Sequence, residues 1–532
     1  MKRILTSILI LFCAGILSGA RSTAVDICVY GENASGCIAA IEGARHGKSV
    51  VLVSKNRHVG GLVTSGLTAT DMNRQAVIGG ITAEFYQRIY KYYENPAVWR
   101  NQGREEFFES SKKRTFTGKN DPRRMQWVYE SGVAEKIMRD MLDEAGVQIH
   151  FDAQVSKVSK KGGRIRNITL TDGSKISAKV FIDCSYTGDL MARSGVGYTV
   201  GREGVSQYGE SFAGIRVHDV DLFGNTSGIN PRTGRPWPLV DAQLWGKPGD
   251  GDSRVQSYCY RVTLTDDPSN QVAISKPEGY NPDYYEVLLG QIRNKPGIQL
   301  KEIITFTPMP NRKTDTNHLD FFGAAHAYPE ASYEERLEIE KQHRTYAQGM
   351  LWFLGHDERV PQYLREEMAR WGYAKDEFGD TGNFPNHLYV RESRRMTGDY
   401  VMTQNNMDKV GRTEAPMSVG RGSYPLDCHF VSTVIVDGKL YREGTMYTAI
   451  PTYPISYRSL TPKKEECENL LVTVCLSASH VAYSSIRMEP QYMVLGQSAA
   501  AAAVLSIDGG CAVQGIDYER LAETLKNEGQ IL

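Results

Sequence analysis

The chain has 532 residues, of which 41% are apolar and 23% are charged, and its formal net charge is +0. This length predicts two or three domains, and the apolar fraction is typical of a globular protein with a full core. A balanced charge provides no electrostatic reason to bind nucleic acid or an anionic membrane, because both reward an excess of Lys and Arg. We therefore expect neither as a partner.

Residues 1–24 have the layout of a secretory signal peptide. Lys2 and Arg3 precede an apolar run over 4–17, and small residues follow through Ala24. The run is too short for a stable membrane span. A retained N-terminal anchor is the alternative. Cleavage near Ala24 would leave an exported protein, periplasmic or secreted, without a membrane segment.

The nine cysteines show no C-x-x-C spacing, and no H-E-x-x-H motif occurs. Both patterns are typical of zinc sites, so we predict no metal centre. In a chain of this length with a full core, scattered cysteines favour free buried thiols over a disulfide framework.

The first structured segment predicts a βαβ unit. Residues 26–30 indicate a buried strand, 35–46 a helix that ends at Gly47, and 49–53 a second strand parallel to the first. The turn reads Gly31-Glu32-Asn33-Ala34-Ser35-Gly36, where a dinucleotide-binding turn reads G-x-G-x-x-G. The pattern favours a dinucleotide site over a plain turn.

This turn departs from the fingerprint at two positions. Asn33 replaces the second glycine, and asparagine tolerates left-handed backbone angles better than most residues. Ser54 stands at the end of the second strand, where an acidic residue usually binds the ribose. Beyond it, Gly60 and Gly61 would let the chain pass close to a flat ligand.

The later segments predict an interrupted domain. Residues 132–146 indicate a helix, and a hairpin around Asp172-Gly173 leads into a buried strand at 180–183. Residues 205–380 lack the βαβ rhythm and contain a long polar helix with a capping box at Ser332. We predict an α/β protein in which 25–204 and 381–532 form a nucleotide-binding domain and 205–380 form an inserted α+β substrate or cap domain.

The C-terminal part contains a predicted strand at 469–474 and a helix with Pro490 in its first turn. Gly496 begins a stripe of small residues on this helix, which suits close approach to a ligand or plain tight packing. Arg487 lies just before the helix, whose free N–H groups favour an anion or a developing negative charge.

Four stretches carry a resemblance to a known family: 26–71, 180–203, 388–404 and 468–505. They resemble FAD-dependent oxidoreductases with the glutathione-reductase type of FAD-binding fold, and more narrowly an exported bacterial group of them. The resemblance implies a Rossmann-like FAD-binding domain, FAD as cofactor, a small-molecule substrate and an electron acceptor of unknown identity.

The resemblance also implies where FAD lies: the turn faces the pyrophosphate, Val155 the adenine, and the start of the last helix the pyrimidine end of the flavin. There the helix dipole can stabilise the anion of reduced flavin. The cofactor-binding residues that it assigns are Gly31, Asn33, Ala34, Gly36, Ser54, Lys55, Arg57, Gly60, Gly61, Thr64, Val155, Cys184, Ser185, Arg487 and Met488.

Three residues are predicted to act in catalysis, namely His480, Arg487 and Arg394. His480 would take a proton from the substrate, with a structural histidine as the alternative. Arg394 belongs to a cluster with Arg391 and Arg395 that could bind a carboxylate or form salt bridges to Glu392 and Asp399. His429 is a weaker candidate.

The sequence as a whole predicts an oxidoreductase that transfers hydride between flavin and a small organic substrate. The aromatic residues of 205–380 suggest a sugar or polyol, because such rings stack on sugars. Three alternatives remain open: a polysaccharide lyase-like enzyme, a flavin-binding protein without turnover, and a degenerate fold without cofactor.

Overall fold

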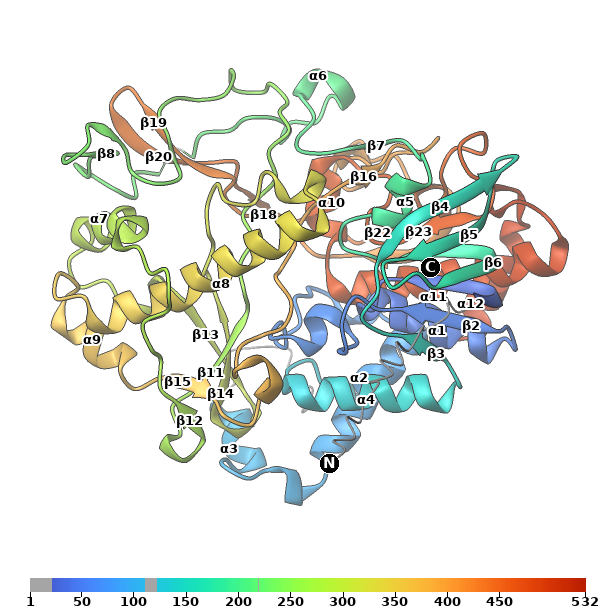
Figure 1. Ribbon diagram of the computed structural model, residues 1–532, viewed down its shortest axis with the longest axis horizontal. Helices are drawn as coiled ribbons and strands as arrows, with labels where there is room; N and C mark the ends of the chain where they lie inside the picture. The colour runs from blue at the N-terminus through green and yellow to red at the C-terminus, as the bar shows by residue number, and fades with distance from the viewer. Residues whose placement is uncertain (1–21, 111–121, 219) are drawn as a thin grey trace, which may run out of the picture.

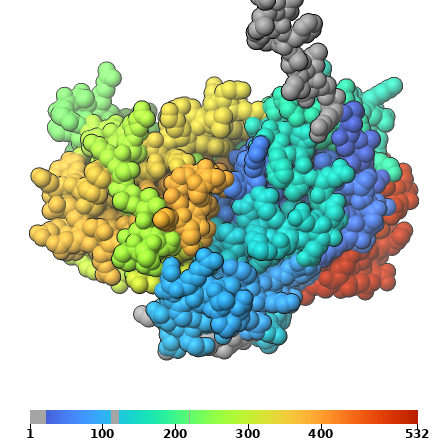
Figure 2. Space-filling view, turned by 60° about the horizontal axis from the view of Figure 1, so that its bottom comes forward, coloured from blue at the N-terminus to red at the C-terminus, as the bar shows by residue number. Residues whose placement is uncertain are grey.

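The computed structural model describes residues 22–110, 122–218 and 220–532. The predicted signal peptide lies outside the described residues up to Arg21. Figure 1 shows the first and last described parts of the chain, in blue and red, on one side and the middle part, in green and yellow, on the other, and Figure 2 shows the same division from below. No helix among the described residues is long and apolar enough to cross a membrane.

The first and last parts of the chain share a seven-stranded mixed sheet. Its order is β3-β2-β1-β6-β5-β4, and β23 pairs with the end of β6. The strands are β1 (Ser22–Tyr30), β2 (Val50–Val53), β3 (Gln148–His150), β4 (Val155–Lys161), β5 (Arg164–Leu170), β6 (Lys175–Asp183) and β23 (Leu470–Val472). The pairs β3·β2, β2·β1, β1·β6 and β6·β23 are parallel, and β4 and β5 form an antiparallel hairpin. This confirms a Rossmann-like α/β arrangement.

Two helices, α1 (Ala34–Arg45) and α11 (Glu489–Gly509), pack on this sheet, where β2, residues 27–30 of β1 and residues 180–183 of β6 are buried. The helices α2 (Gly80–Tyr93), α4 (Ser131–Glu144) and α12 (Tyr518–Asn527) pack in turn against α1 or α11. The predicted βαβ unit, the helix near 132–146 and the helix that begins near Pro490 are confirmed, with boundaries shifted by one or two residues except that β1 begins at Ser22 rather than at residue 26. The neighbours of β1 are β2 on one side and β6 on the other, so β1 is a switch point in the topology.

The middle of the chain forms a five-stranded antiparallel sheet with order β12-β15-β11-β14-β13. Its strands are β11 (Val262–Thr265), β12 (Gln271–Val272), β13 (Thr305–Met309), β14 (Lys313–Asn317) and β15 (Gly372–Ala374). Beside it lie α7 (Glu286–Asn294), α8 (Tyr333–His356) and α9 (Gln362–Met368). The predicted capping box is confirmed: Glu335 N donates to the Ser332 hydroxyl at 3.2 Å, and Ser332 N donates to the Glu335 carboxylate at 2.8 Å.

The chain returns to the middle part after residue 381. β19 (Ser432–Val436) pairs with β10 (Val240–Asp241) and with β20 (Lys439–Glu443), and Figure 1 shows this small sheet far from the C-terminal helices. The other elements used below are β18 (Leu426–Cys428), β21 (Met446–Thr448), α10 (His480–Ile486) and the 3-10 helix η1 (Gly61–Thr64).

The remaining helices and strands are short or peripheral. They are α3 (Arg104–Ser110), α5 (Asp189–Arg193), α6 (Val205–Tyr208), β7 (Tyr198–Thr199), β8 (Ile229–Asn230), β9 (Arg235–Pro236), β16 (Arg395–Met396), β17 (Ser418–Gly422) and β22 (Tyr453–Ser456). Within the described residues the cysteines are free thiols, and all but Cys511 are buried, as predicted.

Candidate active site

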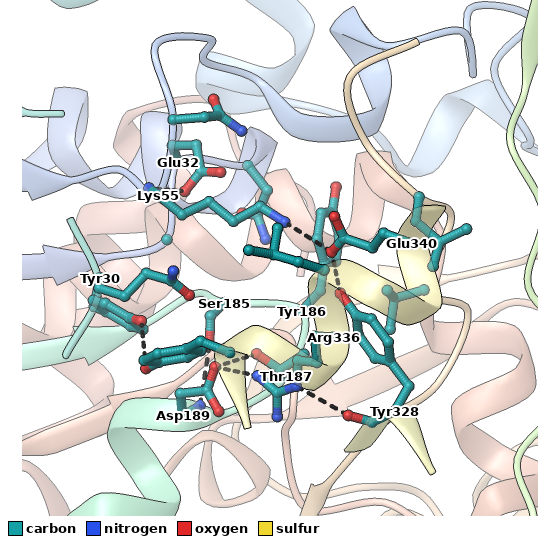
Figure 3. A pocket seen from close by; sticks show the side chains of 18 of the residues that line it. Tyr30, Glu32, Lys55, Ser185, Tyr186, Thr187, Asp189, Tyr328, Arg336 and Glu340 are labelled. Carbon is teal, nitrogen blue, oxygen red and sulfur yellow. Dashed lines mark hydrogen bonds and ion pairs between the residues drawn. The ribbon is translucent and has the colours of Figure 1, made fainter. Parts of the chain in front are cut away.

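A cavity of about 270 Å³ opens at the carboxyl ends of β1, β2 and β6 (Figure 3). One wall comes from the segments that follow these strands, at 30–33, 53–56 and 185–189. The opposite wall comes from α8, through Tyr333, Arg336 and Glu340. Open α/β sheets bind ligands at the carboxyl ends of their strands beside a switch point, and this cavity lies there.

The glycines of the turn are required by close packing. A Cβ atom on Gly31 would lie 2.6 Å from Ser185 N, and Gly31 has a φ of 109°. A Cβ atom on Gly36 would lie 1.7 Å from Gly31 O, and one on Gly61 would lie 2.7 Å from the Asn33 side chain. The first and third positions of the fingerprint therefore keep their structural roles.

Asn33 fills the second position in a different way from the one predicted. Its φ is −68° and its ψ is 180°, so the backbone is extended and no left-handed conformation is needed. It is the N-cap of α1, and its side-chain oxygen accepts a hydrogen bond from Gly36 N at 3.1 Å. N-cap residues take extended angles, and asparagine is among the best of them. Its amide also donates to Cys184 O, which joins the turn to the end of β6.

Glu32 is the acidic residue of this cavity that lies at the end of β2, and the sequence motif did not predict it. The Ser54 hydroxyl donates to Asn56 O and lies outside the cavity lining. The Glu32 carboxylate lines the cavity at the end of β2 and accepts a hydrogen bond from Lys55 N at 3.2 Å. Glu32 is only 5% exposed, and this burial raises the pKa of its carboxyl. The sequence signal that could have identified Glu32 is that an acidic residue stands inside the glycine turn.

Some of the other predicted cofactor residues line this cavity, and others lie outside its lining. Lys55 and Ser185 line it, whereas Arg57 is exposed and pairs with Asp152. Val155 begins β4, and both of its backbone groups already have partners. Val155 N donates to the Tyr30 hydroxyl at 3.3 Å, and the Tyr333 hydroxyl donates to Val155 O at 2.8 Å. The predicted adenine contact stays a prediction. It requires the Tyr30 and Tyr333 hydroxyls to leave their hydrogen bonds to Val155.

The start of α11 gathers buried polar atoms. Arg487 donates to the Tyr389 hydroxyl at 2.9 Å and to Asp427 O at 2.8 Å, and Met488 is the N-cap. The Glu489 carboxylate accepts a hydrogen bond from the Tyr186 hydroxyl at 2.8 Å, and burial raises its pKa to about 8. Within the described residues, Arg487 Nε, Glu489 Oε2 and Gln491 Oε1 are buried without a partner. Buried polar atoms rarely stay unpaired, so these atoms are available to pair with a polar ligand at this end of α11.

His480 lies at the start of α10 in a buried network. Its Nδ1 atom is 2.8 Å from Glu392, and its Nε2 atom is 3.6 Å from Cys428 Sγ. Burial disfavours the charged ring, but the Glu392 carboxylate outweighs it and raises the pKa of His480 to about 10. The ring therefore carries its proton at neutral pH. This favours a proton donor over the predicted base, and the catalytic role of His480 stays a prediction.

The arginine cluster that includes Arg394 is neutralised within the chain. Arg394 pairs with Asp189 at 2.8 Å and Glu330 at 2.7 Å. Arg391 pairs with Asp320 at 2.5 Å, and Arg395 pairs with Glu203 at 2.5 Å and also with Glu392. The geometry favours the salt-bridge alternative, although most partners differ from those expected, because they come from distant segments.

A second cavity, of about 380 Å³, lies between β18 and the middle part of the chain. Its polar lining includes Asp427 and His429 near β18, His318 and Asp320 after β14, and Arg442 on β20. Arg487 and His480 contact Asp427 and Cys428, which both line this cavity. The predicted flavin end and the second cavity therefore share a wall.

The described residues contain one cluster that could hold a metal ion, formed by Glu42, His46 and Glu528. Its His46 Nε2 atom lies 3.1 Å from Glu42 and 2.7 Å from Glu528. The cluster lies at the last turn of α1, whereas the nucleotide cavity lies at the first turn. It forms a network of hydrogen bonds and ion pairs that joins α1 to the segment after α12.

A Rossmann-like sheet with a glycine turn at its switch point defines a dinucleotide-binding protein. The family model of the FAD dependent oxidoreductases matches residues 26–525, so the chain belongs to this family. FAD is therefore its cofactor, and the protein is an oxidoreductase. This confirms the resemblance to FAD-dependent oxidoreductases found in the sequence.

Individual relatives match only parts of the chain. A vinyl phenol reductase from Lactiplantibacillus plantarum is 48% identical over 88 residues, which are 15% of this chain and 18% of that protein. An L-amino acid deaminase from Proteus vulgaris is 14% identical over 35% of this chain and 54% of its own, with a TM-score of 0.24. An L-proline dehydrogenase from P. horikoshii is 14% identical over 35% of this chain and 59% of its own, also with a TM-score of 0.24.

The residues present fit FAD at both ends of the site. The tight turn between β1 and α1 leaves a cavity where a pyrophosphate can meet the start of a helix. The unpaired atoms of Arg487, Glu489 and Gln491 offer both donors and acceptors, which suits the polar edge of a pyrimidine ring.

Proposed function

We propose that this oxidoreductase exchanges hydride between FAD and a small organic molecule bound in the 380 Å³ cavity. One observation carries the proposal: Arg487, which is predicted to lie at the flavin end, and His480, which is predicted to act in catalysis, contact the wall of that cavity. The cofactor supplies the hydride chemistry when bound, and the protein supplies orientation, electrostatics and protons.

His429 is the residue that we propose for proton exchange with the substrate. It lines the cavity, and its Nδ1 atom lies 3.2 Å from the Asp320 carboxylate. Asp320 is in turn held by Arg391 at 2.5 Å. A histidine oriented by a fixed carboxylate keeps one ring nitrogen directed elsewhere, which is the arrangement that acid–base catalysis requires.

The finer fold assignment is also a proposal. The β4–β5 hairpin beside β6 and the last parallel strand β23 support a FAD-binding part of the glutathione-reductase type. A separate apolar cluster, which includes Leu289, Phe353 and Tyr389, supports a cap formed mainly by 205–380. We propose that this cap encloses the substrate against the flavin.

The substrate class suggested by the aromatic loops, a sugar or polyol, has no support from the family or the relatives. Trp245 is exposed, but the Arg254 guanidinium already lies 4.2 Å from the centre of its ring. Trp245 lies outside the lining of the 380 Å³ cavity.

Export also remains a proposal, supported by the charged and apolar pattern of residues 1–24. In the structure β1 begins at Ser22, and Ser22–Ala24 pair with residues 175–177 of β6. Cleavage after Ala24 would remove these pairs. Determining the N-terminal residue of the protein recovered from its own host would decide both export and the cleavage position.

The first experiment is a visible absorption spectrum of the purified protein before and after acid precipitation. We expect flavin bands that move to the supernatant, which would establish noncovalent FAD. Bands that stay with the pellet would establish a covalent link, and a colourless protein that takes up no added FAD would overturn the proposal.

Turnover is then measured by anaerobic bleaching of the flavin with candidate reductants and by reoxidation of the reduced enzyme with candidate acceptors. A vinyl phenol belongs among the acceptors because of the local similarity to a vinyl phenol reductase. We expect His429→Gln to slow turnover about 100-fold or more with an unchanged flavin spectrum. Unchanged turnover would remove His429 from the proposal.

A further inference from the structure

Arg442 is a buried cation in the second cavity. It lies on β20, lines the cavity and is 8% exposed. Its guanidinium carbon stands 3.7 Å from the centre of the Phe322 ring, and its Nη1 atom donates to the Thr433 hydroxyl. Within the part of the chain that the structure describes, Arg442 forms no ion pair. Burial lowers the pKa of its guanidinium to about 10, so it remains charged at neutral pH.

Each carboxylate that lines this cavity already has a cationic partner. Asp320 pairs with Arg391 at 2.5 Å, and Asp427 lies 3.8 Å from Arg487. Glu302, at the rim, pairs with Lys295 at 2.5 Å. A buried charge without a partner costs several kcal/mol, so the uncompensated charge of Arg442 calls for an anion that the chain itself does not supply.

The lining limits what this anion can be. Three carboxylates already face the cavity, so a single negative charge meets less repulsion than a phosphate dianion would. The rest of the lining includes apolar side chains, among them Leu288, Ile303, Phe322 and Met350. A volume of about 380 Å³ is that of a small-molecule pocket.

We propose that Arg442 binds the carboxylate of the substrate, which is therefore a small organic acid with an apolar body. Stacking on Phe322 covers one face of the guanidinium and leaves its N–H edge for the carboxylate, which arginine can bind with two parallel hydrogen bonds. The inference rests on the proposed function, because it assigns the substrate class to the cavity proposed there.

The test compares acids with their neutral isosteres on the FAD-loaded protein. Propionate, phenylacetate, benzoate and cinnamate are titrated by calorimetry, and each is matched with its primary amide. We expect at least one acid to bind wild type about tenfold or more tightly than its amide. Equal binding of every acid and its amide, or no binding by any of the acids, would overturn the proposal without any variant.

Variants then locate the binding group. We expect Arg442→Gln to bind the acid about tenfold or more weakly than wild type does. Arg442→Lys should keep part of the affinity, and both variants should have unchanged flavin spectra. The matched control is Arg166→Gln, at an exposed position on β5. Wild-type affinity in Arg442→Gln would overturn the assignment. If Arg442→Gln fails to fold, Arg442→Lys still tests the assignment. Wild-type affinity for the acid in Arg442→Lys would exclude a carboxylate bound by two parallel hydrogen bonds from the guanidinium.

The two proposals fail in different ways. An enzyme that binds acids through Arg442 but never exchanges electrons with FAD would contradict the proposed function alone. An enzyme that turns over a neutral substrate at the same rate in wild type and Arg442→Gln would contradict this inference alone.

Discussion

The acidic side chain at the end of β2 comes from Glu32 in the turn and not from position 54. The parallel register pairs Tyr30 with Val53, so the residues that follow the two strands lie side by side. The Glu32 carboxylate therefore reaches the end of β2 and accepts a hydrogen bond from Lys55 N, whereas the Ser54 hydroxyl bonds to Asn56 O. A carboxylate at this place is what binds ribose hydroxyls in such folds.

We expect Glu32→Gln to weaken FAD binding about tenfold, because a hydrogen bond to a charged acceptor is replaced by one to a neutral amide. Ser54→Ala should leave the affinity within about twofold. The measurement is the quenching of flavin fluorescence when apoprotein is added to FAD. Equal affinity of Glu32→Gln and wild type would exclude this role, and a larger loss in Ser54→Ala would return it to Ser54.

The buried carboxyl of Glu489 should make the free energy of unfolding depend on pH. Burial raises the pKa of its carboxyl in the folded protein to about 8, above the value of 4.5 expected without burial. The folded state therefore binds this proton more tightly than the unfolded state. The contribution of the Glu489 carboxyl to the free energy of unfolding is fully present below about pH 4.5 and is lost as the pH rises toward 8.

We expect Glu489→Gln, which stays neutral, to gain stability relative to wild type as the pH rises through this window. The gain is at most about 1.4 kcal/mol per pH unit. Urea unfolding of both proteins from about pH 5 to about pH 9 measures it. Parallel stability curves would show that the carboxyl has an ordinary pKa.

At the scale of elements, α1 and α11 touch through their backbones. A Cβ atom on Gly496 would lie 2.2 Å from Ser35 O, in the first turn of α1. The sequence left two explanations for the small residues of α11, and at this position helix packing is the one observed. Because α1 also begins at the nucleotide cavity, this contact fixes the direction in which the helix start points.

We expect Gly496→Ala to destabilise the protein by about 1–3 kcal/mol, because the added methyl group meets rigid backbone. FAD affinity should fall as well, since Ser35 would be displaced. Gly515→Ala is the control, because nothing lies within 4 Å of an added Cβ atom there. Thermal unfolding and FAD titration measure both effects, and equal melting temperatures for the two variants would contradict the close approach.

At the scale of the whole molecule, buried ion pairs join segments that are distant in the sequence. Lys313, on β14, is 1% exposed in its side chain and pairs with Glu130 at 2.7 Å, Asp376 at 2.8 Å and Glu377 at 3.0 Å. Glu130 immediately precedes α4, which packs near the Rossmann-like sheet, so this network ties the middle sheet to the nucleotide-binding part.

We expect Lys313→Met to cost about 3–5 kcal/mol, because it leaves two buried carboxylates without a cation. The control is Lys341→Met, at an exposed position on α8. Urea unfolding followed by circular dichroism gives the free energy of unfolding of each variant. A loss below about 1 kcal/mol for Lys313→Met would show that these carboxylates take up protons or water instead.

The sequence by itself determined the features that depend on neighbours along the chain. Apolar runs and glycine stops predicted β1, α1 and β2, and the capping box predicted the start of α8. The family followed from short motifs in order, and the family match agrees with it. Such signals arise within a few residues, where backbone angles and hydrogen bonds are decided locally.

Only the tertiary structure decided which charges are neutralised and which remain available. Arg394 looked available, but Asp189 and Glu330 pair with it. The second cavity joins Asp320, His429 and Arg442 from different strands and loops, and no local pattern connects them. Pairing between distant segments depends on how the nucleotide-binding part and the middle part of the chain pack together, and residue periodicity carries no information about that packing.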